Sequence, residues 1–306
     1  MPSHCEEQYQ FRRRGNPLQT ALAEVLMGYK VLDCTLRDGA YVVDSKFGEK
    51  RICDIITTLE NAKIDIVECG WLRNCVHEKD SVLYSVPDDA KNYLEASKSK
   101  FSLMFDCGRY DVAKLPQNNG LVDIIRIAFY KKSLDEISFV AEEVKNKGYK
   151  VFLQPSNVKE YSKTDLMKLC KRANFIGVNA CYIVDSFGSM FPEDMDLILP
   201  IFEETLDNQI ELGFHSHNNI QLSLALSIKF INDAKRDIII DSTLQGIGRG
   251  AGNTKTELLL EYMNRYKNCA YNIDAIWKGL NNKLMPEKNW EYTAERGFRG
   301  VNNIHP

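Results

Sequence analysis

The sequence predicts an α/β protein folded as a closed (β/α)8 barrel, a TIM barrel, with short extensions at both ends. From Lys30 onward, short runs rich in Val, Ile and Phe alternate with longer amphipathic segments, a pattern typical of parallel strands joined by helical crossovers. Eight such units fall within about 240 residues, the number and length of a closed barrel. An open, doubly wound sheet is the alternative fold for the same alternation.

The strands are predicted where an apolar run lies between polar loops. In chain order they are Val31–Leu36, Asp65–Cys69, Phe101–Phe105, Ile124–Phe129, Val151–Gln154, Phe175–Val184, Glu211–His217 and Ile238–Thr243. The helices are predicted from apolar positions at helical spacing. They are Gly48–Ala62, Asp88–Ser97, the short Val112–Leu115, Leu134–Lys147, Lys163–Arg172, Pro192–Asp207, Gln221–Asn232 and Thr254–Asn264.

Two extensions flank the barrel, which we predict to span residues 30–266. The first, residues 1–29, starts with a polar stretch and carries a short helix over Pro17–Gly28, whose leucines and valine are spaced for one helical face. The second, residues 267–306, contains a helix over Ile273–Leu284. Three aromatic side chains are expected to pack this extension onto the barrel: Trp290, Tyr292 and Phe298.

Composition excludes several classes of protein. A net charge of −3, with 39 basic and 42 acidic residues mixed along the chain, gives no basic face for nucleic acid. No apolar run approaches the length that spans a membrane. The nine cysteines are scattered without a Cys-x-x-Cys pair, which indicates reduced thiols and a cytoplasmic protein. Small-molecule partners and a homo-oligomer stay open.

Two histidines at alternate positions of a predicted strand are the first sign of a site. His215 and His217 point to the same face of the sheet, and Asp38 could complete a set of ligands for a divalent ion. Two core histidines and a turn aspartate are the alternative. Active sites of such barrels lie at the carboxyl ends of the strands, where Arg37, Asp38, Glu68 and both histidines are predicted to converge. This convergence favours the metal site.

Three segments resemble the signature sequences of a metal-dependent barrel superfamily. They are Asp33-Cys-Thr-Leu-Arg-Asp-Gly39, Gly213-Phe-His-Ser-His-Asn218 and Gly246-Ile-Gly-Arg-Gly-Ala-Gly-Asn253. The superfamily contains 4-hydroxy-2-oxovalerate aldolase, hydroxymethylglutaryl-CoA lyase and isopropylmalate synthase, and the resemblance runs from Lys30 to Asn264. The glycine-rich loop is most similar to that of the aldolases. The hydroxymethylglutaryl-CoA lyases carry a cysteine there, which this loop lacks.

The resemblance implies a lyase that cleaves or forms a 4-hydroxy-2-oxo acid through a metal-stabilised, pyruvate-type enolate. Asp38, His215 and His217 would bind Mg²⁺ or Mn²⁺, with Asn253 as a fourth ligand or as the partner of a ligand, and Zn²⁺ or Co²⁺ would also suit the imidazoles. Arg37 would stabilise the oxyanion of the 2-oxo acid substrate, or else form a structural ion pair. An acyl-CoA-dependent Claisen synthase and a metal-binding homologue without catalysis are the alternative functions.

Four further residues are assigned within this framework. Glu68 is expected to orient Arg37 or a metal-bound water, with a structural ion pair as the alternative. Ser186, at the end of the sixth strand, is expected to contact substrate or to cap a turn. Gly250 and Gly252 would let the backbone approach an anion, or would only allow a tight turn.

Tyr41 is the main departure from the aldolases, which have a histidine base at this place. We assign Tyr41 as an acid or base whose pKa a nearby ion lowers, and expect a loss of rate of about a hundredfold in Tyr41→Phe. His77 is the alternative imidazole. Trp71 and Arg73 replace a Gly-His-Gly-type sequence and would reshape the pocket. The chain after Asn264 does not resemble the aldolase domain that docks a dehydrogenase, so no such partner is expected.

Overall fold

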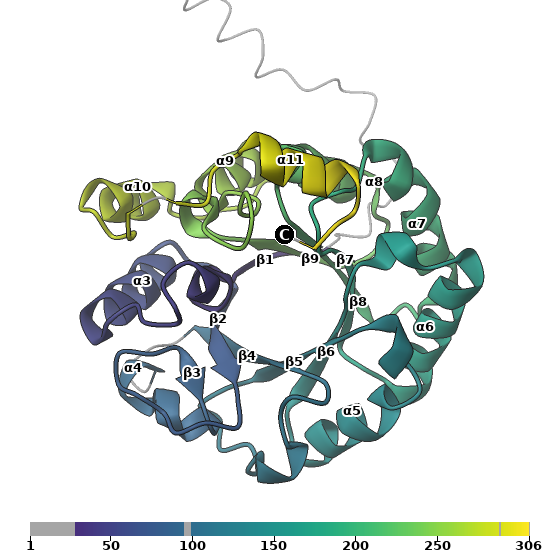
Figure 1. Cartoon of the computed structure of the whole chain (residues 1–306), viewed down its shortest axis with the longest axis horizontal. Helices are drawn as coiled ribbons and strands as arrows, with labels where there is room; N and C mark the ends of the chain where they lie inside the picture. Colours follow the sequence, from purple (N-terminus) through teal and green to yellow (C-terminus); the bar gives the residue numbers. More distant parts are fainter. Residues whose placement is uncertain (1–27, 95–98, 288, 306) are drawn as a thin grey trace, which may run out of the picture.

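A computed structural model describes residues 28–94, 99–287 and 289–305 and shows a closed ring of parallel strands (Figure 1). Within these ranges the barrel strands are β1 (Tyr29–Asp33), β2 (Ile66–Leu72), β4 (Lys100–Asp106), β5 (Ile124–Phe129), β6 (Lys150–Pro155), β7 (Ala180–Asp185), β8 (Glu211–Ser216) and β9 (Ile238–Ser242). Because β1 pairs in parallel with both β9 and β2, the sheet closes on itself. The predicted (β/α)8 barrel is confirmed, and the open sheet is wrong. A two-residue strand, β3 (Leu83–Tyr84), adds to β2 outside the ring.

Helices surround the ring (Figure 1). The longer ones are α3 (Glu49–Asn61), α5 (Ile137–Asn146), α6 (Lys163–Ile176), α7 (Pro192–Thr205), α8 (Ser223–Asp233) and α9 (Thr256–Tyr266). Each has a buried apolar stripe of the kind that amphipathic spacing produces, as with Ile52, Ile55 and Leu59 on α3. The strands bury a separate apolar cluster: Leu32, Cys34, Ile66, Ile124, Phe152, Ala180, Tyr182, Val184 and Ile239.

The first strand ends earlier than predicted. β1 stops at Asp33, and Thr35–Asp38 forms α2, a short helical turn, so the strand does not continue to Leu36. The carboxylate of Asp33 accepts a hydrogen bond from the backbone N–H of Thr35 at 2.9 Å, which favours a turn at this point. Most of the segment Asp33–Gly39, which resembles a signature sequence of the superfamily, therefore lies in a helical turn after β1 and not in a strand.

Two other predicted elements are wrong in part. Phe175 and Ile176 end α6 and do not begin a strand, because Gly177 takes a left-handed φ of 64° and terminates the helix. The predicted helix Val112–Leu115 is a single 3-10 turn over Val112–Lys114, with no fully buried side chain to support a longer helix.

Two predicted helices reach beyond the described residues. The one at Asp88–Ser97 begins as a 3-10 turn over Pro87–Ala90 and continues as α4 (Lys91–Leu94), and its last predicted turn lies outside the described residues. The predicted N-terminal helix, Pro17–Gly28, lies outside them except for its last residue. No helix in the described part of the chain has both the length and the apolar character needed to cross a bilayer.

The C-terminal segment lies over the barrel rim. α10 (Ile273–Asn281) is shorter than predicted, and α11 (Ala294–Val301) crosses the ring near its edge (Figure 1). Trp290 is 2% exposed, and its indole N–H donates to a backbone carbonyl of the loop after β9 at 3.1 Å. Tyr292 and Phe298 are 55% and 63% exposed, so they contribute little to this packing, contrary to the prediction.

Candidate metal centre

Arg37 and Asp38 reach the rim on the helical turn that follows β1, and both are buried. The indole N–H of Trp71 donates to the carbonyl of Arg37 at 2.9 Å and ties the turn to β2. Arg37 donates from Nη1 to Asp38 Oδ1 at 2.8 Å and from Nε to Glu68 Oε2 at 2.7 Å. Burial alone would raise the pKa of Asp38, but nearby positive charge, above all Arg37, holds it well below its usual range. Asp38 is therefore an ionised carboxylate.

His215 lies near the end of β8 and His217 directly follows the strand, and both are buried. One ligand atom each from Asp38, His215 and His217 lies within 4.8 Å of the others, close enough to hold one ion. Burial lowers the pKa of His217 to about 3, so its imidazole is neutral at pH 7, the form that binds metals. The structure thus brings together the three residues that the sequence singled out as ligands.

Asp241 on β9 orients the ring of His215. The Nδ1–H of His215 donates to Asp241 Oδ2 at 2.9 Å, which leaves Nε2 as the ligand atom. Burial alone would raise the pKa of Asp241, but the charge of Arg126 and the bond from His215 lower it, so the carboxylate is ionised. Asp241 was not predicted, although a carboxylate directly after three isoleucines was a visible signal in the sequence.

Arg126, on β5, connects the two halves of the site. It is fully buried, donates from Nη1 to Glu68 Oε2 at 2.8 Å, and forms an ion pair through Nη2 with Asp241. Because Glu68 also binds Arg37, one chain of charged hydrogen bonds runs from Arg37 to His215. Arg126 was not predicted either, and its signal was a charged residue inside an apolar strand.

A second group of potential ligands consists of Cys34, His215 and Asp241. Burial raises the pKa of the Cys34 thiol well above its usual range, and a protonated thiol is a poor ligand. Asp241 is already paired with Arg126. These facts favour the group that contains Asp38.

Asn253 reaches the ligands from the glycine-rich loop after β9. Its side-chain nitrogen donates to Asp38 and, at 3.0 Å, to the carbonyl of Ile247. Its Oδ1 is buried without a partner among the described residues. Gly248 allows this approach, because a Cβ there would lie 2.1 Å from Asn253 Nδ2. An amide oxygen beside one carboxylate and two imidazoles fits a divalent ion.

Gly250 and Gly252 shape the same loop from further away. Both have a left-handed φ, of 65° and 84°, which glycine adopts without strain. A Cβ on Gly252 would lie 2.0 Å from the carbonyl oxygen of Gly246. Neither glycine lines the cavity that Asp38, His215 and His217 line at the carboxyl ends of the strands. Their contact with substrate stays a prediction.

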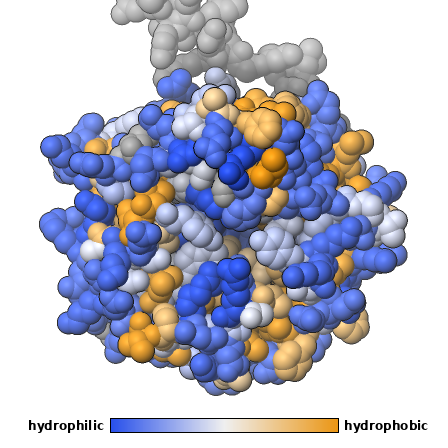
Figure 2. Space-filling model, viewed as in Figure 1, coloured by the Kyte–Doolittle hydropathy of each residue, from blue (hydrophilic) through white to orange (hydrophobic). Residues whose placement is uncertain are grey.

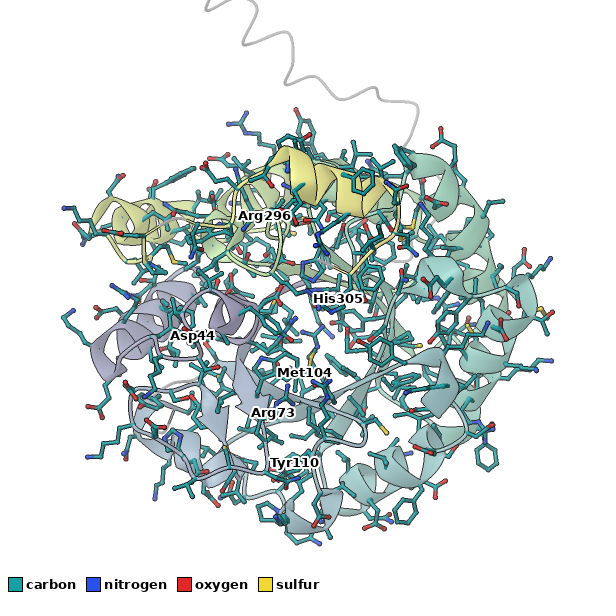
Figure 3. The ribbon with its side chains drawn as sticks, in the orientation of Figure 1. Asp44, Arg73, Met104, Tyr110, Arg296 and His305 are labelled. Atoms are coloured by element: carbon teal, nitrogen blue, oxygen red, sulfur yellow. The ribbon has the colours of Figure 1, made fainter. Side chains whose placement is uncertain are left out.

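The three candidate metal ligands, Asp38, His215 and His217, line a cavity of about 640 Å³ at the carboxyl ends of the strands. The centre of this face is hollowed, and hydrophilic side chains gather around it (Figure 2). Met104, from β4, and His305, from the C-terminal segment, lie toward the middle of the ring (Figure 3). Gln154 also lines the cavity, and its Nε2 is buried without a partner among the described residues. The cavity therefore has room and hydrogen-bond donors for a small polar substrate.

Tyr41 lines this cavity from the 3-10 turn Gly39–Tyr41, with half of the residue exposed. Burial of its inner part raises the pKa of the phenol, so Tyr41 is protonated at neutral pH. The alternative imidazole, His77, does not line the cavity, and its Nδ1 lies 2.8 Å from the carbonyl of Leu83. Trp71 is covered by the guanidinium of Arg73 at 4.1 Å.

Ser186 lines the cavity just after β7. Its hydroxyl accepts a hydrogen bond from the backbone N–H of Asn157 at 2.8 Å, so it orders the rim whether or not it touches substrate. Contact between Ser186 and substrate stays a prediction.

Similar proteins are lyases of related chemistry. The chain is 25% identical over 285 residues to oxaloacetate decarboxylase of Mycobacterium tuberculosis, covering 90% of this chain and 83% of the relative. It is 27% identical over 249 residues to 4-hydroxy-2-oxovalerate aldolase of Pelotomaculum thermopropionicum, covering 77% and 70%. Its structure is similar to that of the N-terminal domain of a candidate aldolase from Bacteroides vulgatus, with a TM-score of 0.77 and 28% identity over 90% of this chain and 93% of the other.

The sequence model of the HMGL-like family matches residues 29–281, which include the whole barrel and every proposed metal ligand. The resemblance seen in the three signature segments is thereby confirmed, and the chain belongs to the HMGL-like family.

Proposed function

We propose that this protein is a divalent-metal-dependent carbon–carbon lyase that acts on a 2-oxo acid through a pyruvate-type enolate. The observation that carries the proposal is the 2.8 Å bond from Arg37 to Asp38, inside a cavity that His215 and His217 also line. It puts a guanidinium beside the ligands, where the oxygens of a chelated 2-oxo acid would lie. Cleavage of 4-hydroxy-2-oxovalerate and decarboxylation of oxaloacetate, the reactions that the relatives' names describe, both leave pyruvate.

The residues of the site have distinct roles in this reaction. A bound Mg²⁺ or Mn²⁺, or Zn²⁺ or Co²⁺, would supply Lewis-acid stabilisation of the charge that develops on the 2-oxo oxygen. Arg37 Nη2, which its bonds to Asp38 and Glu68 do not use, donates to that oxygen. Glu68 holds the guanidinium in place and is a positioning residue. Gln154 Nε2, which has no hydrogen-bond partner within the described part of the chain, donates to the substrate carboxylate.

Exchange of the methyl protons of pyruvate tests this proposal without knowledge of the aldehyde. Protein loaded with Mg²⁺ or Mn²⁺ should incorporate deuterium from D2O into pyruvate, as measured by mass spectrometry, and chelator-treated protein should not. The loaded protein should also release pyruvate from a panel of 4-hydroxy-2-oxo acids and oxaloacetate. If neither exchange nor release occurs with any of the metals, the chain is a non-catalytic homologue or an acyl-CoA synthase, and the proposal fails.

Tyr41→Phe is expected to lower kcat/KM for aldol cleavage about tenfold. This is less than the loss of about a hundredfold expected from the sequence, because burial raises the pKa of the phenol and makes Tyr41 a hydrogen-bond donor rather than a base. As a protonated phenol, Tyr41 donates a hydrogen bond to the 4-hydroxyl oxygen of the substrate and stabilises the negative charge that develops there in cleavage, while the phenol keeps its own proton. Because half of Tyr41 is exposed, water can partly replace it, and a neutral hydrogen bond contributes only about 0.5–1.5 kcal/mol. Tyr130→Phe is the matched control, since Tyr130 lines the same cavity and is 52% exposed. Equal rates for both variants would remove Tyr41 from the mechanism.

A further inference from the structure

We infer, resting on the proposed function, that Arg249 binds a second anionic group of the substrate. The substrate is then a 2-oxo acid whose far end carries a carboxylate or a phosphate. Arg249 determines specificity for that end of the molecule, while the metal ligands and Arg37 hold the other end.

Arg249 differs from the other arginines of the cavity in its partners. Three arginines line the cavity: Arg37, Arg109 and Arg249. Arg37 is paired with two carboxylates, and Arg109 lies 3.8 Å from Asp106. None of the ion pairs found in the described part of the chain includes Arg249. Among the three arginines of the lining, Arg249 is therefore the one whose charge is left for a bound anion to neutralise.

The contacts of Arg249 hold it in place without neutralising it. Nη2 donates to the carbonyl of Ser186 at 2.8 Å, and Nη1 donates to Nε2 of His305 at 3.1 Å. The guanidinium lies 5.7 Å from the ring centre of Tyr41. Nε is buried and has no hydrogen-bond partner among the described residues. A half-buried guanidinium fixed by neutral groups is prepared to bind an anion.

The loop places Arg249 within reach of a molecule bound at the metal ligands. Its neighbour Gly248 packs against the ligand group, since a Cβ there would lie 2.9 Å from Asp38 Oδ2. Arg249, Asp38 and both histidines line one cavity. Lys132 adds positive charge to the same lining, and His305, which lies toward the middle of the ring (Figure 3), accepts a hydrogen bond from Arg249. A small dianion can therefore contact the ligands and Arg249 at once.

Aldol addition of pyruvate to matched aldehydes tests the inference. Succinic semialdehyde is compared with butanal, and glyceraldehyde 3-phosphate with glyceraldehyde, so that each pair differs in one anionic group. In one pair we expect the charged aldehyde to be preferred at least about tenfold in kcat/KM, because charge-assisted hydrogen bonds are the stronger ones. The pair that shows the preference identifies the group as carboxylate or phosphate. Arg249→Gln should abolish the preference, and Arg249→Lys should restore part of it.

Arg265→Gln is the matched control. Arg265 is exposed on α9, and its substitution changes the net charge of the protein by the same amount as Arg249→Gln. It should keep the preference. A wild type that uses neutral aldehydes equally well, or an Arg249→Gln variant that keeps the preference, overturns the inference.

Two further measurements separate this inference from the proposed function. Deuterium exchange into pyruvate without any preference among aldehydes overturns only the role of Arg249. If exchange is absent, calorimetry of inorganic phosphate and of succinate with the metal-free protein still tests that role. We expect Arg249→Gln to weaken binding of one of the two about tenfold, and equal binding in variant and wild type would overturn the inference.

Discussion

Arg126→Ala is expected to lower the free energy of unfolding by about 3–5 kcal/mol, the usual cost of removing one partner from a buried ion pair. Arg126 is fully buried and holds Glu68 and Asp241, both carboxylates in the barrel interior. Without the guanidinium, Glu68 keeps only Arg37 and Asp241 keeps only His215, so each buried carboxylate loses a charged partner or takes up a proton at a cost. Urea denaturation should show a lower midpoint with an unchanged slope.

The control for Arg126 is a surface arginine in an ion pair. Arg265 lies 3.2 Å from Glu261 one turn away on α9; Arg265 is exposed and Glu261 is partly exposed. Arg265→Ala should change the free energy of unfolding by no more than about 1 kcal/mol. A loss in Arg126→Ala as small as that of the control would contradict the assigned role.

His217→Ala is expected to weaken binding of Mn²⁺ by about a hundredfold or more. Loss of a group that merely orients a ligand typically costs 10–100-fold in affinity, and loss of a ligand itself should cost at least as much. His217 contributes one of the three ligand atoms gathered within 4.8 Å. Isothermal titration calorimetry measures the affinity directly, and circular dichroism reports whether the barrel is intact.

His77→Ala is the matched control, because His77 does not line the cavity and its Nδ1 is occupied at the carbonyl of Leu83. It should bind Mn²⁺ as the wild type does. Stoichiometric binding at unchanged affinity in His217→Ala would mean that the ion binds elsewhere.

The ligand group was predictable because its signals are local. His215 and His217 are two residues apart at a strand end, and Asp38 follows another strand. The rule that strand ends meet at one rim then joins segments that are distant in the sequence. Where β1 ended was not predictable, because apolar residues continue to Leu36 and the turn is held by hydrogen bonds such as that from the Thr35 N–H to the Asp33 carboxylate.

The supporting residues were missed because their roles depend on pairing across the barrel. The sequence around Arg126 does not indicate that Glu68 and Asp241 contact it. The three residues lie on three different strands and meet only in the folded barrel. Arg249 was not predicted as a site residue, because it lies in a glycine-rich loop whose sequence indicates a role for the backbone. Its significance is that it has no carboxylate partner among residues 28–94, 99–287 and 289–305, which only the packed structure reveals.

The bond between Asn253 and Asp38 joins residues 215 positions apart, and β1 meets β9 at the same seam. The ligand set is therefore completed only when the beginning and the end of the barrel come together, a contact between distant parts of the chain whose closure has a large entropic cost. An ion that binds this set stabilises the closed barrel over every partly folded form. Metal affinity thus becomes a measure of whether the ring has closed between β1 and β9.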